Sequence, residues 1–176
     1  RYYNSTQWTQ FKKVLKKSRL YSHTQYWAFE VALKMTKVGT IYIEDMELGL
    51  SRSISKVMGD AEIESFSDLS EDKNPIHLSE DAGNASIFKS RVAHGMLSAS
   101  LFSALLGEYL PGHGAIYLSQ SLQFTQPVYP GDEVTASVTV INIDNVKNRI
   151  TLKCEAKVGD KLVIKGEALA LAPSRG

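Results

Sequence analysis

Apolar and polar residues alternate in five segments of the chain, a pattern typical of β-strands with one buried face. The segments are residues 49–58, 115–124, 133–143, 149–158 and 162–171. Turn-forming residues at 130–132, 144–145 and 159–160 separate the last four segments. We therefore expect five strands, and we expect the last four to form an antiparallel meander.

Two segments between the first and second strands have helical features instead. In residues 61–69, apolar side chains recur every third position after Asp60, which predicts a short helix with an acidic start. Residues 95–107 carry no charged side chain and are rich in small ones. A helix that is apolar on every face belongs in a core. The pattern therefore predicts an α+β fold in which a sheet curls around one long helix.

The segment between these two helices is polar. Residues 70–92 are punctuated by Asn74-Pro75 and Gly83-Asn84, so we expect a loop with short helical turns. Loops held by a rigid scaffold often carry binding and catalytic residues.

A change in composition near residue 46 indicates a domain boundary. Residues 1–45 hold eight basic and three acidic side chains, and apolar residues 8, 11, 14 and 15 alternate with lysines at helical spacing. This basic amphipathic helix either docks on a surface or partner, or packs on its own domain. We therefore expect an N-terminal extension over 1–45, a main domain over 46–172 and a tail over 173–176.

Charge and cysteine content exclude several classes of protein. The 20 basic and 19 acidic side chains give a net charge of +1, which offers no field for binding nucleic acid. A single cysteine, Cys154, forms neither an internal disulfide nor a Cys-rich metal site, and its strand position predicts a core residue. We expect a soluble cytoplasmic protein without a membrane span. The first 29 residues lack acids, as transit peptides do, so the mitochondrial matrix is the alternative.

The polar loop contains the strongest candidates for chemistry. Asp72 and His77 lie five residues apart, and Pro75 between them restricts the backbone on both sides. A carboxylate and an imidazole aimed at one spot can hold a water molecule and move its protons without a cofactor. A surface acid with a capping histidine is the simpler interpretation of the same two residues.

A second candidate is the start of the long helix at His94-Gly95. A helix N-terminus leaves amide N–H groups unpaired and carries partial positive charge, so it can stabilise a carbonyl oxygen that gains negative charge. Helix capping and tight packing also account for this dipeptide.

The sequence gives little support for a metal site, a serine nucleophile or a phosphate-binding loop. His23 and His113 have no second metal ligand at suitable spacing, and a site from His77 and His94 would need a third ligand that the sequence does not identify. The serines of residues 95–107 lack the turn that presents a nucleophile. No glycine-rich phosphate loop is present, so we expect neither metal nor cofactor.

The residues described so far resemble a known family, the MaoC-like (R)-specific enoyl-CoA hydratases of the hotdog superfamily. Their pattern Asp-x-Asn-Pro-aliphatic-His is matched by residues 72–77. The match continues through 91–96, 100–107, 110–112, 116–122, 127–128 and 131–134, and it covers roughly residues 46–172. It is closest to the short, single-hotdog members that serve polyhydroxyalkanoate synthesis. Glu71 departs from the glycine that many members carry before the aspartate.

The resemblance implies a fold and a reaction. The fold would be an antiparallel five-stranded sheet around a central helix, paired into a homodimer. The reaction would be reversible hydration of trans-2-enoyl-CoA to (R)-3-hydroxyacyl-CoA, with Asp72 and His77 activating water. The thioester carbonyl would bind the Gly95 amide, and Asn74, His94 and Ser103 would complete the binding site.

Three alternatives remain open. A hotdog acyl-CoA thioesterase would direct water at the carbonyl carbon, although the intact motif at residues 74–77 disfavours it. A dehydratase would use the same chemistry on acyl carrier protein thioesters. In a non-catalytic scaffold, the basic N-terminal segment would be the functional part.

Overall fold

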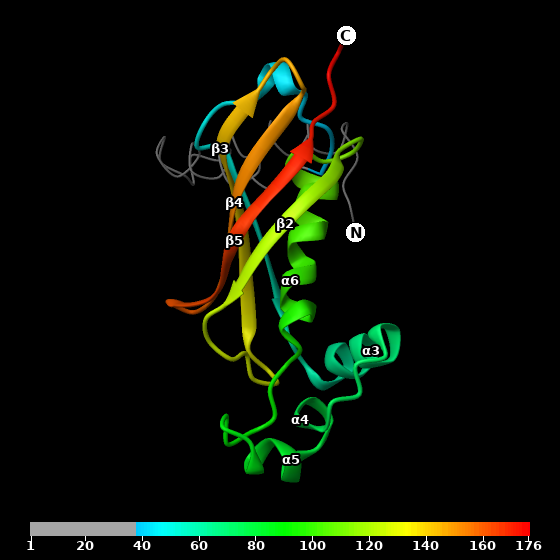
Figure 1. Cartoon of the computed structure of the whole chain (residues 1–176), viewed down its shortest axis with the longest axis vertical. Coiled ribbons are helices and arrows are strands. Elements are labelled where there is room, and N and C mark those ends of the chain that lie inside the picture. The colour runs from blue at the N-terminus through cyan, green and yellow to red at the C-terminus, as the bar shows by residue number, and fades with distance from the viewer. Residues whose placement is uncertain (1–37) are drawn as a thin grey trace, which may run out of the picture. The chain divides into compact units, whose positions relative to one another are not determined.

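A computed structural model describes residues 38–176, which form one folded unit. Figure 1 shows their elements. The amphipathic helix expected over residues 8–17 lies outside the described residues. No helix within 38–176 is long and apolar enough to cross a membrane.

Five antiparallel strands form a single sheet in the spatial order β1-β3-β4-β5-β2. Their bounds are β1 Ser51–Val57, β2 Ile116–Phe124, β3 Glu133–Asp144, β4 Arg149–Val158 and β5 Lys161–Leu171. Each bound lies within two residues of the expected segment. The alternation of apolar and polar residues predicts these strands well because their inward-facing side chains are buried. On β4, for example, the even-numbered positions 150–156 are all buried.

The expected meander of four consecutive strands is wrong at its first connection. Strands β3, β4 and β5 pair in sequence order, but β2 pairs with β5 at the far edge. Residues 125–132 make the crossing, and their backbone hydrogen bonds to Val163, Ala93 and Met58 hold them across the end of the sheet. A connection of this length can reach a strand that is not its neighbour. The shorter turns at 145–148 and 159–160 join adjacent antiparallel strands.

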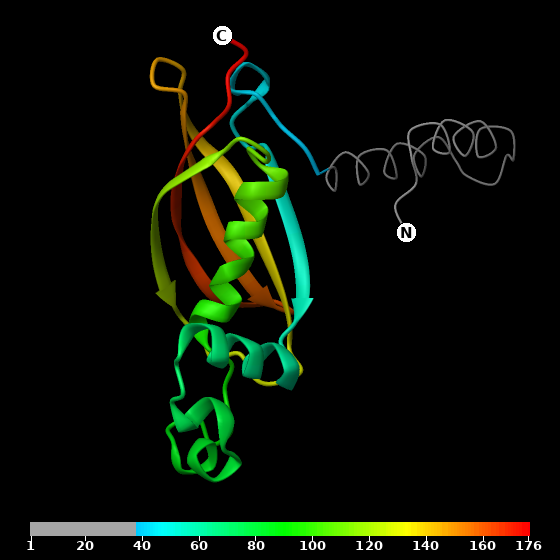
Figure 2. The same ribbon diagram turned by 90° about the vertical axis from the view of Figure 1, so that its right-hand side faces the viewer.

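The central helix α6, Gly95–Ala104, continues into a π-helical segment η2, Leu105–Tyr109. Figure 2 shows α6 in front of the sheet, with the sheet curving around it from β1 to β2. Leu97, Leu101 and Phe102 of α6 and Leu105 of η2 are buried, and they belong to the same core cluster as the inward residues of β3, β4 and β5. Burial of such side chains is the main stabilising contribution to this fold.

One face of α6 is not covered by the described chain, contrary to the expectation of a helix buried on all sides. Met96, Ser100, Ser103 and Gly107 are exposed and recur at helical spacing; we call them the α6 stripe. The absence of charged residues over 95–107 correctly predicted a helix. It did not predict that one face of this helix lacks a covering neighbour within residues 38–176.

Three short helices lie beyond one end of the sheet, at the end where α6 begins (Figures 1 and 2). They are α3 Asp60–Ser70, α4 Pro75–Leu78 and α5 Glu80–Ala85. Arg91 links two of them, because its guanidinium pairs with Asp60 at the start of α3 and with Glu80 at the start of α5. The expected loop over 70–92 is thus a loop with two helical turns held against the first helix.

The folded unit begins before residue 46. The amide of Ile41 donates to Pro111, and the amide of Ile43, a buried core residue, donates to Pro173. Glu44, in the 3-10 turn η1 Ile43–Asp45, accepts hydrogen bonds from Ser174 and Arg175. Residues 38–45 and the C-terminal tail therefore pack together on the domain.

Candidate active site

A cavity of about 400 Å³ lies where α4, the start of α6 and the end of β2 meet. Its walls are mostly apolar, with a few polar groups on one side. The lining includes Asp72, Ile76, His77, Phe88, Val92, Ala93, His94, Gly95, Met96, Ser98, Phe124, Pro127, Val128, Val163 and Ile164. An apolar pocket with a few convergent polar groups is typical of a small-molecule site.

His77 is placed by the short helix α4. The side chain of Asn74 accepts a hydrogen bond from the Ile76 amide and caps this helix, while Pro75 occupies its first turn. The ring is buried, and its Nδ1 lies 2.7 Å from the carbonyl oxygen of Val92. A carbonyl only accepts, so Nδ1 carries the proton and Nε2 presents a lone pair.

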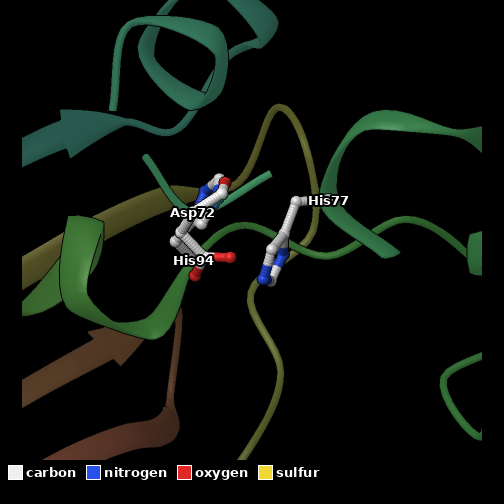
Figure 3. A group of neighbouring side chains, drawn as sticks. All are labelled: Asp72, His77 and His94. Atoms are coloured by element: carbon white, nitrogen blue, oxygen red, sulfur yellow. The ribbon is translucent and has the colours of Figure 1, made fainter. Parts of the chain in front are cut away.

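Asp72 follows α3 and is held through its backbone. Its carbonyl oxygen accepts hydrogen bonds from Ser67 Oγ at 2.8 Å and from His94 Nε2 at 3.1 Å. Its carboxylate accepts from the Asn74 amide at 3.2 Å and has no cationic partner within salt-bridge distance among residues 38–176. Figure 3 shows this carboxylate turned toward the His77 ring. The backbone is therefore fixed while the carboxylate keeps free lone pairs.

His94 touches both of these residues. It is 2% exposed, and its ring stacks on that of His77 with 3.8 Å between centroids and 31° between planes. Because Nε2 donates to the Asp72 carbonyl, Nδ1 is an acceptor, and it has no hydrogen-bond partner among residues 38–176. Burial lowers the pKa of His94 below its ordinary value of 6.5, against the opposing effect of its hydrogen bond to Asp72. The ring is therefore neutral at neutral pH.

Gly95 begins α6, as the sequence predicted, and it lines the cavity. A Cβ placed on Gly95 would lie 2.8 Å from the ring of Phe124 at the end of β2. Only glycine permits this approach. The first amides of α6 have no carbonyl one turn earlier to bind, so the helix start offers N–H groups beside the Asp72 and His77 pair.

Two predicted site residues lie elsewhere. Asn74 does not line the cavity and acts as the cap of α4. Ser103, two turns along α6, is exposed and lines a separate cavity with Tyr117 and Gln120, between α6 and β2. The chain thus brings Asp72, His77, His94 and Gly95 together, but not Ser103.

Sequence reasoning missed two residues of this cavity. Ser98 is completely buried, and its Oγ has no hydrogen-bond partner from Val38 to the C-terminus. Phe124 covers Gly95 from the neighbouring strand. Helical spacing places Ser98 one turn after Gly95 and so could have indicated it, whereas the contact with Phe124 depends on the position of β2 at the sheet edge.

The structure also brings a third polar side chain, Asp72, close to His77 and His94, which the sequence did not indicate. One ligand atom each from Asp72, His77 and His94 lie within 4.8 Å of one another. His94 is 22 positions from Asp72 in the chain, and only the packing of α6 against the loop brings the two together.

Comparison with known proteins matches residues 34–161 to the MaoC like domain. An (R)-specific enoyl-CoA hydratase of Rhodospirillum rubrum is 47% identical over 135 residues, covering 77% of this chain and 94% of that protein. The solved (R)-hydratase from Aeromonas caviae, involved in PHA biosynthesis, is 45% identical with a TM-score of 0.72, covering 74% of this chain and 99% of that one. A mitochondrial 3-hydroxyacyl-[acyl-carrier-protein] dehydratase of Arabidopsis thaliana is 35% identical, covering 68% of this chain and 74% of its own length.

Proposed function

The chain belongs to the MaoC-like domain family, and we propose that it reversibly hydrates trans-2-enoyl-CoA to (R)-3-hydroxyacyl-CoA in the cavity lined by Asp72, His77 and Gly95. One observation carries this proposal. A carboxylate, an imidazole with a free lone pair and the N-terminus of a helix all face one mainly apolar cavity. The names of the relatives at 45–47% identity support the same reaction.

His77 is the group that accepts a proton from water. Its Nδ1 donates to Val92, so Nε2 is an acceptor in the resting state. Asp72 holds the second hydrogen of the water through its carboxylate, and it stabilises the imidazolium that forms when the proton is transferred. The hydrogen bond from Nδ1 to Val92 supports this proposed base role, which the sequence left open.

The Gly95 amide stabilises the charge that develops on the thioester carbonyl oxygen. As the water oxygen bonds to the β-carbon, the electrons of the double bond move toward that carbonyl and form an enolate. A preorganised N–H at a helix start lowers the energy of such an oxyanion.

Proton return completes the reaction. The His77 imidazolium delivers its proton to the α-carbon on the face where the hydroxyl was added. One O–H bond and the carbon–carbon π bond break, while one C–O and one C–H bond form, so the elements of water are added with no net change at the protein. Dehydration is the same path in reverse.

We also propose that two copies of the chain form a homodimer. Within residues 38–176, β2 pairs only with β5 and so has a free edge, and its exposed apolar residues include Ile116, Leu118 and Phe124. The α6 stripe lies beside this strand, where residues of both elements line a second cavity. An unpaired strand edge beside an uncovered helix face is a surface that a second copy can cover.

The carrier and setting of the reaction are further proposals. We propose CoA as the carrier and a cytoplasmic role in supplying (R)-3-hydroxyacyl-CoA for polyhydroxyalkanoate synthesis, with support from the name of the Aeromonas caviae relative. The name of the Arabidopsis thaliana relative supports the alternative of acyl carrier protein thioesters in mitochondria. Comparing kcat/KM for the same enoyl group on the two carriers distinguishes these alternatives.

An assay with two substrates tests the proposed reaction. With crotonyl-CoA, the purified chain should remove the enoyl absorbance without releasing free thiol. With saturated butyryl-CoA, it should release no thiol above the uncatalysed rate. Thiol release from butyryl-CoA with unchanged enoyl absorbance from crotonyl-CoA would identify a thioesterase instead.

A further inference from the structure

Three polar side chains of the cavity lie close together, one more than the proposed acid–base chemistry uses. One ligand atom from each of Asp72, His77 and His94 lies within 4.8 Å of the other two. Figure 3 shows the three side chains gathered in one small region. We call them the Asp-His-His cluster. It comes from three segments: the residues after α3, helix α4 and the start of α6.

Both imidazoles are oriented by backbone carbonyls. His77 donates its Nδ1 proton to Val92 at 2.7 Å, and His94 donates its Nε2 proton to Asp72 at 3.1 Å. Each ring therefore keeps one lone pair, on Nε2 of His77 and on Nδ1 of His94. Histidines that bind metal have this same arrangement, because the outer hydrogen bond fixes the tautomer and raises the basicity of the free nitrogen.

The second of these lone pairs is buried and unused. His94 is 2% exposed, and its Nδ1 has no hydrogen-bond partner in the part of the chain that the structure describes. Leaving a buried acceptor unpaired costs free energy, so native proteins rarely do so without a water, ion or ligand to satisfy it. The hydration chemistry derived above makes no use of this atom.

We propose that the Asp-His-His cluster binds one zinc-class divalent metal ion. Two imidazole nitrogens and one carboxylate are a usual set of three protein ligands for zinc, and they leave a fourth position open. The ion would occupy the place where the proposed reaction holds its water, and it would engage the lone pair of His77. Metal binding would therefore inhibit hydration, a consequence that rests on the proposed function, although binding itself does not.

Other described residues offer a poorer site. His113 pairs with Glu108 at 2.9 Å, but both side chains are more than half exposed and no third ligand is present within residues 38–176. The thiol of Cys154 is completely buried in the sheet core. His113 therefore serves as a matched control for the cluster.

Calorimetric titration of the full chain with zinc chloride, after treatment with chelator, tests the binding. The wild type should bind one ion per chain. The variants Asp72→Asn, His77→Gln and His94→Gln should each weaken binding at least about tenfold. His113→Gln and His23→Gln should bind as the wild type does. Circular dichroism and urea unfolding identify any variant that fails to fold, and the isosteric Asp72→Asn keeps the test valid if a histidine variant does.

Absence of binding to the wild type would overturn the proposal. So would unchanged affinity in folded Asp72→Asn and His77→Gln, or loss of binding only in His23→Gln. A parallel assay of crotonyl-CoA hydration should show inhibition with a midpoint near the measured Kd, reversed by chelator. If the metal-free chain hydrates no enoyl thioester, the proposed function fails, while the calorimetric comparison still decides the metal site.

Discussion

Nδ1 of His77 lies 2.7 Å from the carbonyl oxygen of Val92, so the segment that leads into α6 fixes the tautomer of the ring on α4. The two residues are 15 positions apart, and the contact joins the loop that carries Asp72 to the helix start that carries Gly95. The nitrogen of His77 that keeps its lone pair is therefore set by backbone packing.

Replacing the ring of His77 tests its role as base. His77→Gln should lower kcat for crotonyl-CoA hydration at least about 100-fold, because an amide cannot take the water proton. KM should change much less. Steady-state kinetics check this, with His113→Gln, a substitution of an exposed histidine, as the control. A kcat within threefold of the wild type would remove His77 from the chemistry.

An added methyl group at the start of α6 should impair the reaction without preventing folding. In Gly95→Ala the new Cβ lies 2.8 Å from the Phe124 ring, which is half-exposed and can move, so the chain should fold. The methyl group and displaced ring would obstruct approach to the helix N-terminus and should lower kcat/KM at least about tenfold. Gly59→Ala, outside the cavity and the α6 stripe, is the control, because its added Cβ would approach only the end of the flexible Glu62 side chain, at 3.0 Å. Equal kcat/KM for the two variants would contradict the assigned role of Gly95.

The α6 stripe provides a test of the dimer. Light scattering after gel filtration should give the wild type twice the 19.5 kDa chain mass. Ser103→Arg places a long charged side chain on the stripe and should shift the protein toward the monomer. Ser65→Arg, at an exposed position of α3, should leave the mass unchanged. A wild-type monomer, or a dimer that tolerates Ser103→Arg, would show that a second copy does not cover this face.

The buried ring of His94 predicts a pH dependence of stability. Its pKa is lowered in the folded state, so below about pH 6.5 the unfolded chain binds a proton that the folded chain does not. The stabilisation from this residue is complete above that pH and is lost as the pH falls through it. Urea unfolding at about pH 7.5 and about pH 5.5 should show a smaller decrease in unfolding free energy for His94→Gln than for the wild type. Identical decreases would mean that His94 is protonated in the folded state.

The lone cysteine should resist alkylation. Cys154 is completely buried, and burial raises the pKa of its thiol to about 11, so little thiolate forms at neutral pH. Mass spectrometry after iodoacetamide treatment should find no adduct on the native chain and full modification in denaturant. Rapid modification of the native chain would contradict this burial, which the sequence had already predicted.

The sequence predicts most elements here but not their arrangement. Alternation locates β3 and β4 closely because every second residue is buried, and the motif at residues 72–77 contains Asp72 and His77, which both line the cavity. It does not place β2 beside β5, because the length of the 125–132 connection allows several pairings. Two contacts of the site join segments that are distant in the sequence: His94 with Asp72, and Phe124 with Gly95. Local sequence patterns cannot predict such contacts.

The configuration of the product tests the central claim most directly. Crotonyl-CoA should be converted to 3-hydroxybutyryl-CoA of (R) configuration, because Asp72 and His77 present water to one face of a substrate held at Gly95. Chiral chromatography of the released hydroxyacid measures this, with Asp72→Asn treated in parallel as a variant expected to form almost none. An (S) product, or equal yields from the wild type and Asp72→Asn, would contradict the account.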